Sequence, residues 1–353
     1  MTLPNSAAEA NGLGLDRFAE GDPVEAARLL SHAYRLLADE PAILVNLGLA
    51  LMQQGRIEPA ERCYRMALRS RELRVRRSAA KNLGFLHLWL GQFEEGWSWH
   101  GRRFAGEAFE TTQWKGEPLN GRVLTIWNDV GMGDAFQFVR YTKPLIQRGE
   151  RVRWAVHASQ LAIFQKHLAW PLTDVVDRSR IDRNSCLHIP LMSLIPILDL
   201  TTNWGRTFAE PTWQLDCCDP ENKTTNAVGL CWASNPGDRT MHRYKSTNPE
   251  RLKQRVEHLG SQPKLISLQS DEVEAHQKLG LVAADTSWVE TLERIFECKH
   301  VVSVDTAVAH LAGGAGRTVD LMLGYPADWR WQQFTTQTSL WYPNLKCWPI
   351  NPH

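Results

Sequence analysis

The sequence has no paired cysteine motif and no excess of charge of one sign. Its seven cysteines are odd in number and include no Cys-x-x-Cys pair, which argues against a disulfide framework and a structural zinc site. We expect reduced, buried thiols. Forty Lys and Arg residues against 39 Asp and Glu residues leave a net charge of +1. A nucleic-acid or acidic membrane partner would therefore need a local basic patch.

Segments typical of targeting or membrane insertion are also missing. The first 14 residues contain neither a basic stretch nor an apolar core. The longest apolar stretch, residues 189–200, is interrupted by Pro190, Ser193 and Pro196. We therefore expect a cytoplasmic protein with no membrane span. The 353-residue length and the 43% hydrophobic content are typical of a globular chain with two or three domains.

An internal repeat occupies the first hundred residues. Gly21 and Ala26 recur 34 positions later as Gly55 and Ala60, and a third copy begins 36 positions further on at Gly91. Glycine at a turn between paired helices permits a positive φ, and small residues let two helices approach closely. The pattern predicts helical hairpins, and its period resembles that of tetratricopeptide repeats.

The helical array has two possible roles, binding of a partner and capping of the domain that follows. Tetratricopeptide repeats usually bind a partner, but about three repeats are also the minimum for a stable stack that only caps the following domain. A basic run between the second and third copies is either a docking patch for an acidic partner or a solvated helix face. Because the run is poor in aromatic residues, we expect a solvated face and no nucleic-acid partner. Its members are Arg62, Arg65, Arg69, Arg71, Arg74, Arg76, Arg77 and Lys81.

After residue 104 the pattern changes to alternating strands and helices, which is typical of parallel sheets. We expect helices at 134–148 and 159–168, and a linker rich in Thr, Asn, Pro and Asp at 201–226. The expected strands are 123–127, 152–156, a weaker one at 175–176, 228–232, 265–268, 301–304 and 319–323. The predicted domains are a repeat domain at 1–104 and two α/β domains at 105–225 and 226–353.

Three loops follow strands, where open parallel sheets place their ligand sites. In the first, Gly131 and Gly133 let the backbone approach a ligand. Asp134 then enters a helix, where its carboxylate either caps N–H groups or points into the crevice. The third glycine of a dinucleotide fingerprint is missing, which argues against a nicotinamide enzyme.

The second and third loops are candidates for a phosphate site. Residues 233–246 combine small residues, a turn and cations, as a diphosphate site requires. An exposed basic loop without a ligand would have the same composition, so both interpretations stay open. A buried strand then delivers Asp305 and Thr306 to a helix start, where backbone N–H groups bind phosphates. His310 shares a helix face with Thr306, and it is either a ligand contact or a hydrogen-bonded core residue.

The motifs together resemble a known family. They are GMGD at 131–134, CWASNP at 231–236, SVDTAVAHLAG at 303–313, ADWRW at 327–331 and WYP at 341–343. Their order is similar to that of bacterial proteins that fuse tetratricopeptide repeats to a heptosyltransferase-like glycosyltransferase of family 9. The resemblance implies a GT-B fold, with two Rossmann-like α/β domains and the active site in the cleft between them. It also implies a nucleotide-diphosphate sugar as donor, with no obligatory metal and no permanent cofactor.

The resemblance implies a role for each matching residue. Asp134, in the loop with Gly131 and Gly133, matches the general base that takes the acceptor proton. The donor side is matched by Lys245, Asp305, Thr306 and His310, with Asn235 and Gly313 beside them. In the implied inverting displacement, a cation and a helix start stabilise the departing diphosphate.

Departures from the family pattern bear on activity. Asp129 and Val130 replace Glu and Gln before the first motif. Arg317 and Thr318 replace a small residue and Pro, and Asp320 enters a strand expected to be buried, where a charge is costly unless it is paired. Two functions therefore stand: an enzyme whose repeats recruit an acceptor protein or glycan, or a repeat scaffold with an inactive GT-B body. The C-terminal tryptophans either stack on a ligand or pack the last segment across both α/β domains.

Overall fold

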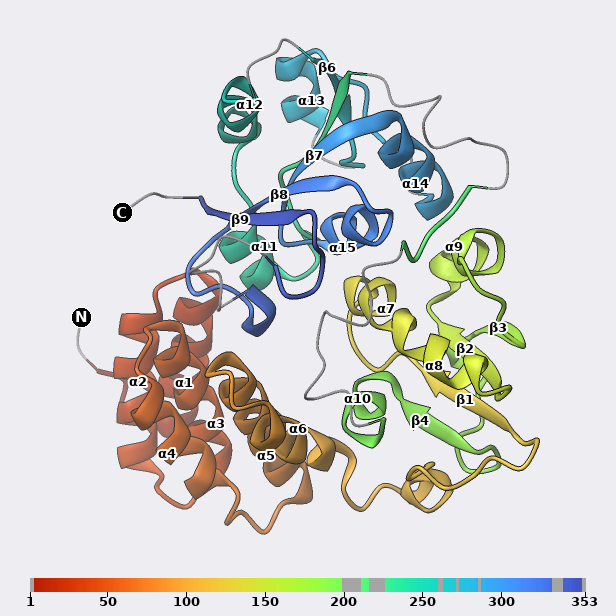
Figure 1. Ribbon diagram of the computed structural model, residues 1–353. Helices are drawn as coiled ribbons and strands as arrows, with labels where there is room; N and C mark the ends of the chain where they lie inside the picture. The colour runs from red at the N-terminus through yellow and green to blue at the C-terminus, as the bar shows by residue number, and fades with distance from the viewer. Residues whose placement is uncertain are drawn as a thin grey trace. The chain divides into compact units, whose positions relative to one another are not determined.

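The computed structural model describes residues 3–198, 211–215, 226–259, 263–270, 273–284, 287–331 and 339–350. The chain forms two compact units, here called the repeat unit and the α/β unit (Figure 1). The repeat unit comprises residues 1–110, 237–244 and 325–333, and the α/β unit comprises residues 111–236, 245–324 and 334–353. Most of the linker predicted at 201–226 lies outside the described residues. The division into three domains at 1–104, 105–225 and 226–353 stays a prediction.

The repeat unit is built on three helical hairpins. The helices are α1 (Ala7–Ala19), α2 (Pro23–Leu36), α3 (Pro41–Gln53), α4 (Ile57–Ala67), α5 (Leu73–Trp89) and α6 (Phe93–Gly101). They pair as α1 with α2, α3 with α4 and α5 with α6. Gly21, Gly55 and Gly91 at the three turns have φ values of 82°, 71° and 74°, a region that side chains disfavour. The predicted hairpins and their turn glycines are confirmed.

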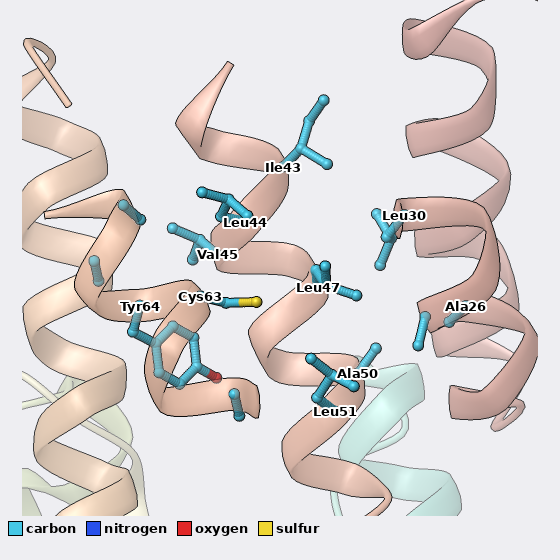
Figure 2. Close-up of a cluster of buried hydrophobic side chains, with 14 of the residues drawn as sticks. Ala26, Leu30, Ile43, Leu44, Val45, Leu47, Ala50, Leu51, Cys63 and Tyr64 are labelled. Carbon is cyan, nitrogen blue, oxygen red and sulfur yellow. The ribbon is translucent and has the colours of Figure 1, made fainter. Parts of the chain in front are cut away.

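The core of the repeat unit lies between consecutive hairpins. Ala26 and Ala60, the small residues of the repeat pattern, are fully buried. Figure 2 shows the side chains of α3 between Ala26 and Leu30 of α2 on one side and Cys63 and Tyr64 of α4 on the other. These side chains belong to one continuous apolar cluster that extends into α5. Packing between hairpins therefore replaces a single central core, as in other repeat arrays.

The first sheet of the α/β unit is wholly parallel, with the order β3-β2-β1-β4. Its strands are β1 (Val123–Trp127), β2 (Arg151–Val156), β3 (Asp174–Asp177) and β4 (His188–Pro190), and its helices are α7 (Met132–Phe138), α8 (Lys143–Gln147), α9 (Leu161–His167) and α10 (Leu194–Ile197). The single helix predicted at 134–148 is wrong. A 3-10 turn at Val139–Thr142 separates α7 from α8, because Pro144 in the first turn of α8 has no N–H to continue the preceding helix.

The second sheet is also parallel, with the order β6-β5-β7-β8-β9. Its strands are β5 (Ala227–Cys231), β6 (Lys264–Ser267), β7 (Cys298–Val304), β8 (Thr318–Leu323) and β9 (Leu345–Pro349), and its helices are α11 (Arg239–Lys245), α12 (Pro249–Glu257), α13 (Val273–Leu279), α14 (Trp288–Glu297) and α15 (Ala307–Gly314). The predicted fold class of helical repeats followed by two parallel α/β sheets is confirmed. The sequence analysis missed β4 and β9, which are edge strands that end in prolines.

Asp320, the charged residue of β8, has partners. Its side chain accepts from Arg255 Nε of α12 at 2.7 Å and from Trp348 Nε1 of β9 at 2.9 Å, and it is 2% exposed. Burial raises the pKa of Asp320, but His300, whose Nε2 lies 3.4 Å away, and the hydrogen bonds from Arg255 and Trp348 outweigh burial and hold the pKa below its ordinary value. The charge is therefore part of the packing of this sheet.

The cysteines in the described part of the chain are free thiols. They are Cys63, Cys231, Cys298 and Cys347, which are buried, and Cys186, which is half-buried. Burial raises the pKa of the Cys298 and Cys347 thiols to about 12. Free, buried thiols are confirmed at four positions, Cys186 is free but only half-buried, and Cys217 and Cys218 lie outside the described residues.

Candidate functional site

The first site loop joins β1 to α7 and is fixed by its own side chains. Asn128 accepts from the Val130 N–H at 3.2 Å and donates to the Gly131 carbonyl at 3.1 Å. Asp134, which is half-buried, accepts from the Gly131 N–H at 2.8 Å through Oδ2. This carboxylate therefore caps the start of α7, as one of its two predicted roles requires. Its role as general base stays a prediction.

The second site loop follows β5 and is tied to its surroundings by backbone hydrogen bonds. The Ala233 N–H donates to Gln269 Oε1 at 3.1 Å, and the Ser234 N–H donates to Ser246 Oγ at 2.9 Å. Asn235 is exposed in the turn that follows. Sequence analysis did not identify Gln269, although its position directly after a predicted strand was a usable signal.

An ion pair joins the end of this loop to the third loop. Lys245 Nζ, on the last residue of α11, lies 2.7 Å from Asp305 Oδ2. The Asp305 side chain is 8% exposed and that of Lys245 is 28% exposed. A largely buried carboxylate thus holds the ammonium of Lys245 at the carboxyl end of β7. The structure brings together two of the predicted donor-side residues.

Thr306 caps α15 directly after Asp305. Its Oγ1 accepts from the Val308 N–H at 3.2 Å, and Cys231 Sγ at the end of β5 lies 3.7 Å from the same hydroxyl. The first turn of a helix presents backbone N–H groups that have no partner within the helix. The ion pair of Lys245 with Asp305, which carries no net charge, lies next to these amides beside the adjacent strands β5 and β7.

Helices α7 and α15 lie next to each other (Figure 1), and Gly133 lies at their contact. A Cβ at this position would lie 3.0 Å from His310 Cδ2 and 3.2 Å from Ala307 Cα. The absence of a side chain at Gly133 therefore lets the two helices approach closely, and its contact with a ligand stays a prediction. As a result, the helix that carries Asp134 and the helix capped by Thr306 begin next to each other. The structure brings the first and third loops together, as the resemblance implies.

His310 and Gly313 contact Tyr342 of the WYP motif. His310 is 5% exposed, and its Nδ1 lies 3.0 Å from the Tyr342 hydroxyl. A Cβ on Gly313 would meet the Tyr342 ring at 2.7 Å. The geometry agrees with the core interpretation of His310, and contact of either residue with a donor stays a prediction.

Arg140 is a residue that sequence analysis missed. It is 2% exposed, donates to the Trp341 carbonyl at 2.8 Å and places its guanidinium 4.6 Å from the centre of the Tyr342 ring. Phe138 contacts the Trp341 ring edge-on at 5.9 Å. The segment at 341–342 thus joins the helices of the first sheet to α15, as the packing interpretation of the C-terminal tryptophans expects.

Within the described ranges, no group of three or more His, Cys, Asp or Glu side chains is placed to hold a metal ion. Among the same residues, every helix is too short or too polar to cross a bilayer.

The N-terminal helices match a known repeat family. Its sequence model, described as tetratricopeptide repeat, covers residues 17–81. This segment consists of tetratricopeptide repeats. Their predicted basic run forms ion pairs with neighbouring acids, such as Arg65 with Glu61 at 2.7 Å, and Arg77 with Glu107.

No curated protein sequence matches the chain, but several solved structures are similar to it. The E. coli heptosyltransferase WaaC with ADP is 14% identical, with 65% of this chain and 93% of that chain covered and a TM-score of 0.45. The E. coli ADP-heptose lps heptosyltransferase II is 13% identical, with coverages of 66% and 91% and a TM-score of 0.41. A mutant of the Thermobaculum terrenum O-GlcNAc transferase is 14% identical, with coverages of 92% and 76% and a TM-score of 0.32. The function of this chain is therefore argued from its own residues.

Proposed function

We propose that the chain is a glycosyltransferase that moves a sugar from a nucleotide-diphosphate donor to an acceptor hydroxyl with inversion. The observation that carries the proposal is the meeting of α7 and α15 at Gly133. One helix brings a carboxylate, Asp134, and the other brings a capped N-terminus beside the ion pair of Lys245 with Asp305. Displacement of a diphosphate requires a base for the acceptor hydroxyl and cationic or N–H donors for the leaving oxygens.

In the proposed reaction, Asp134 takes the proton of the acceptor hydroxyl as its oxygen attacks the anomeric carbon. The bond from that carbon to the diphosphate oxygen breaks, and its electron pair leaves with the nucleoside diphosphate. Lys245 and the amides of the first turn of α15 stabilise the charge that develops on the leaving oxygens. They supply the positive charge that a metal ion supplies in other phosphate sites.

The proposal assigns acceptor recruitment to the tetratricopeptide repeats. One face of α6 lines a hollow of about 520 Å³ with Phe93, Trp99 and Arg102. The Arg102 guanidinium lies 4.3 Å from the centre of the Trp99 ring. An aromatic ring beside a cation suits either a peptide or a sugar surface. In the proposed enzyme, Trp99→Ala should raise KM for the acceptor and leave donor affinity unchanged.

Donor binding is the first test of the proposal. The full chain is screened by thermal shift against ADP, UDP, GDP and their sugars, since a ligand that binds only the folded state raises Tm. We expect a rise with one nucleotide, and a loss of that rise in Lys245→Ala and Thr306→Ala. Lys253→Ala, which removes an exposed charge on α12, is the matched control. No rise with any compound would support the inactive scaffold instead.

Transfer is tested with Asp134→Asn. The amide keeps an oxygen for the Gly131 N–H but has lost the basic carboxylate. We expect transfer to fall by about 10²–10⁴-fold, the range of general base catalysis, with donor affinity unchanged within a few fold. Turnover and donor affinity are measured separately, by product formation and by calorimetry. Normal turnover in this variant would show that another group accepts the proton.

A further inference from the structure

The imidazole of His310 is enclosed on both edges within the α/β unit. Its Nδ1 lies 3.0 Å from the Tyr342 hydroxyl, and its Cδ2 would lie 3.0 Å from a Cβ placed on Gly133 at the start of α7. Nδ1 and Cδ2 are the two ring atoms bonded to Cγ, so they mark opposite edges of the ring. One edge of the imidazole therefore faces Tyr342, and the other faces the helix that carries Asp134.

The contact with Tyr342 decides between two orientations of the imidazole. A half-turn about the Cβ–Cγ bond exchanges Nδ1 with Cδ2 and Nε2 with Cε1, and both orientations fill almost the same volume. Only the orientation with Nδ1 at Tyr342 lets the ring bond to the hydroxyl, because the donors and acceptors of imidazole are its nitrogens. Nε2, which is bonded to Cδ2, then lies on the α7 side of the ring. The hydroxyl thus selects which atom of His310 faces the start of α7.

Tyr342 is itself fixed by several contacts. It is 2% exposed, and a Cβ on Gly313 would lie 2.7 Å from its ring, so the glycine leaves room for it. The Arg140 guanidinium lies 4.6 Å from the ring centre and donates to the Trp341 carbonyl at 2.8 Å. Ser339 Oγ accepts from the Tyr342 N–H at 3.3 Å. A hydroxyl on a ring that is already fixed orients its neighbour with little further loss of entropy.

The oriented imidazole lies close to the proposed diphosphate site. His310 follows Thr306, the cap of α15, by about one helical turn. We propose that Tyr342 is a positioning residue for His310. Its hydroxyl donates to Nδ1, which leaves the proton of the neutral ring on Nε2. The Nε2–H is thereby directed to the α7 side, as a hydrogen-bond donor for an oxygen of the nucleotide-diphosphate sugar. The inference rests on the proposed function for its ligand, but not for the state of the ring.

The state of the ring is tested in the full chain without any nucleotide, by ¹⁵N NMR of labelled histidine at a pH at which the ring is neutral. His310→Gln assigns the two ring nitrogens through the loss of their signals. We expect one tautomer in wild type, with the proton on Nε2, and a mixture of both tautomers in Tyr342→Phe, which keeps the aromatic ring and loses only the hydroxyl.

Tyr141→Phe is the matched control, because it removes a phenol hydroxyl from another buried tyrosine of the same unit. This variant should leave the tautomer of His310 unchanged. A proton on Nδ1 in wild type overturns the proposal without any variant. The same tautomer in wild type and Tyr342→Phe also overturns it, and a lower Tm would then mean that Tyr342 only packs against the helix.

Affinity for ADP, UDP, GDP and their sugars is then measured by calorimetry. For the compound that wild type binds, we expect Tyr342→Phe to lower affinity about threefold to tenfold, a typical coupling between neighbouring groups. In a His310→Ala background the same substitution should cause no further fall, because the hydroxyl acts through the imidazole. A further fall of equal size overturns the positioning role. If wild type binds none of the compounds, the proposed function fails, while the NMR result still decides whether Tyr342 sets the state of His310.

Discussion

The two units of this protein use close contacts in different ways. In the repeat unit, a glycine on the first helix of each hairpin faces a residue 16 positions later on the second helix. The three pairs are Gly14 with Leu30, Gly48 with Tyr64, and Gly84 with His100. In the α/β unit, the decisive contacts are polar and distant in sequence, such as Arg255 with Asp320 and Arg140 with the Trp341 carbonyl, 65 and 201 positions apart.

This difference separates two sources of stability. Apolar packing in the repeats depends on volume, because a Cβ at any of these three glycines would lie too close to the facing residue of the second helix. The polar network around Asp320 depends instead on complete pairing, because a buried charge without its partner is costly. Changes of volume should therefore weaken the repeat unit, and changes of charge should weaken the α/β unit.

The largest effect is expected when a charge is removed from the α/β network. Asp320→Ala leaves Arg255, whose side chain is 18% exposed, without its carboxylate. We expect a loss of about 3 kcal/mol in the free energy of unfolding, because an unpaired charge remains in a poorly solvated place. Native-state hydrogen exchange of β8 amides measures this loss locally.

The control is an exposed pair of the same types in the first sheet. Arg153 and Asp174 lie 3.3 Å apart, and their side chains are 41% and 47% exposed. Asp174→Ala should lower the free energy of unfolding by less than about 1 kcal/mol. Similar losses in Asp320→Ala and Asp174→Ala would contradict the role that we assign to the buried network.

A smaller effect is expected when a methyl group is added to the repeat core. In Gly84→Ala the new Cβ would lie 2.7 Å from the His100 backbone nitrogen, so α6 must move away from α5. Overpacking of this kind costs about 1–3 kcal/mol. Hydrogen exchange of α5 and α6 amides should report the loss, whereas amides of β8 should not change.

Gly12→Ala in α1 is the matched control for this substitution. Nothing lies within 4 Å of a Cβ built at Gly12. Because alanine favours a helix over glycine, this variant should be more stable by up to about 1 kcal/mol. The two substitutions are chemically identical and should have opposite signs. A loss of stability in both would mean that helix contact is not what distinguishes the two glycines.

The same difference explains what could be predicted from the sequence. Contacts of the repeats recur with the period of the sequence, so Gly21, Gly55 and Ala60 identified the hairpins without a structure. The strands and the three site loops were found because buried strands and turns have local signals. The pairing of Lys245 with Asp305 has no such signal, since it depends on where two loops lie in space.

Gly133 and Arg140 show the limit most clearly. A glycine beside a helix start is compatible with contact to a ligand and with contact to another helix, and only the position of α15 reveals the helix contact of Gly133. Arg140 looked like any arginine on a predicted helix, yet it is buried against Trp341 and Tyr342. Docking of residues 237–244 on the repeats was missed for the same reason, because it joins parts of the chain that no local pattern relates.

The smallest predicted effect is a difference between the two units in how their stability depends on pH. Burial lowers the pKa of His100 well below the ordinary histidine value, and the nearby positive charges of Arg103, Lys81 and Arg330 lower it further. Neither ring nitrogen of His100 has a hydrogen-bond partner among the described residues. His100 is therefore neutral in the folded repeat unit, and below pH ~6.5 only the unfolded chain takes up the proton.

The sign follows from which state binds the proton. The free energy of unfolding contains the full contribution of neutral His100 above pH ~6.5 and loses about 1 kcal/mol between pH 7.5 and 5.5. The contribution of Asp320, whose pKa lies below its ordinary value, is complete above pH ~4 and is lost only below it.

Hydrogen exchange should thus show α5 and α6 weakening from pH 6.5 downward while β8 remains protected. His100→Leu should abolish this slope in the repeat unit, whatever its stability at pH 7.5. An equal slope in wild type and His100→Leu would assign the pH dependence to another histidine.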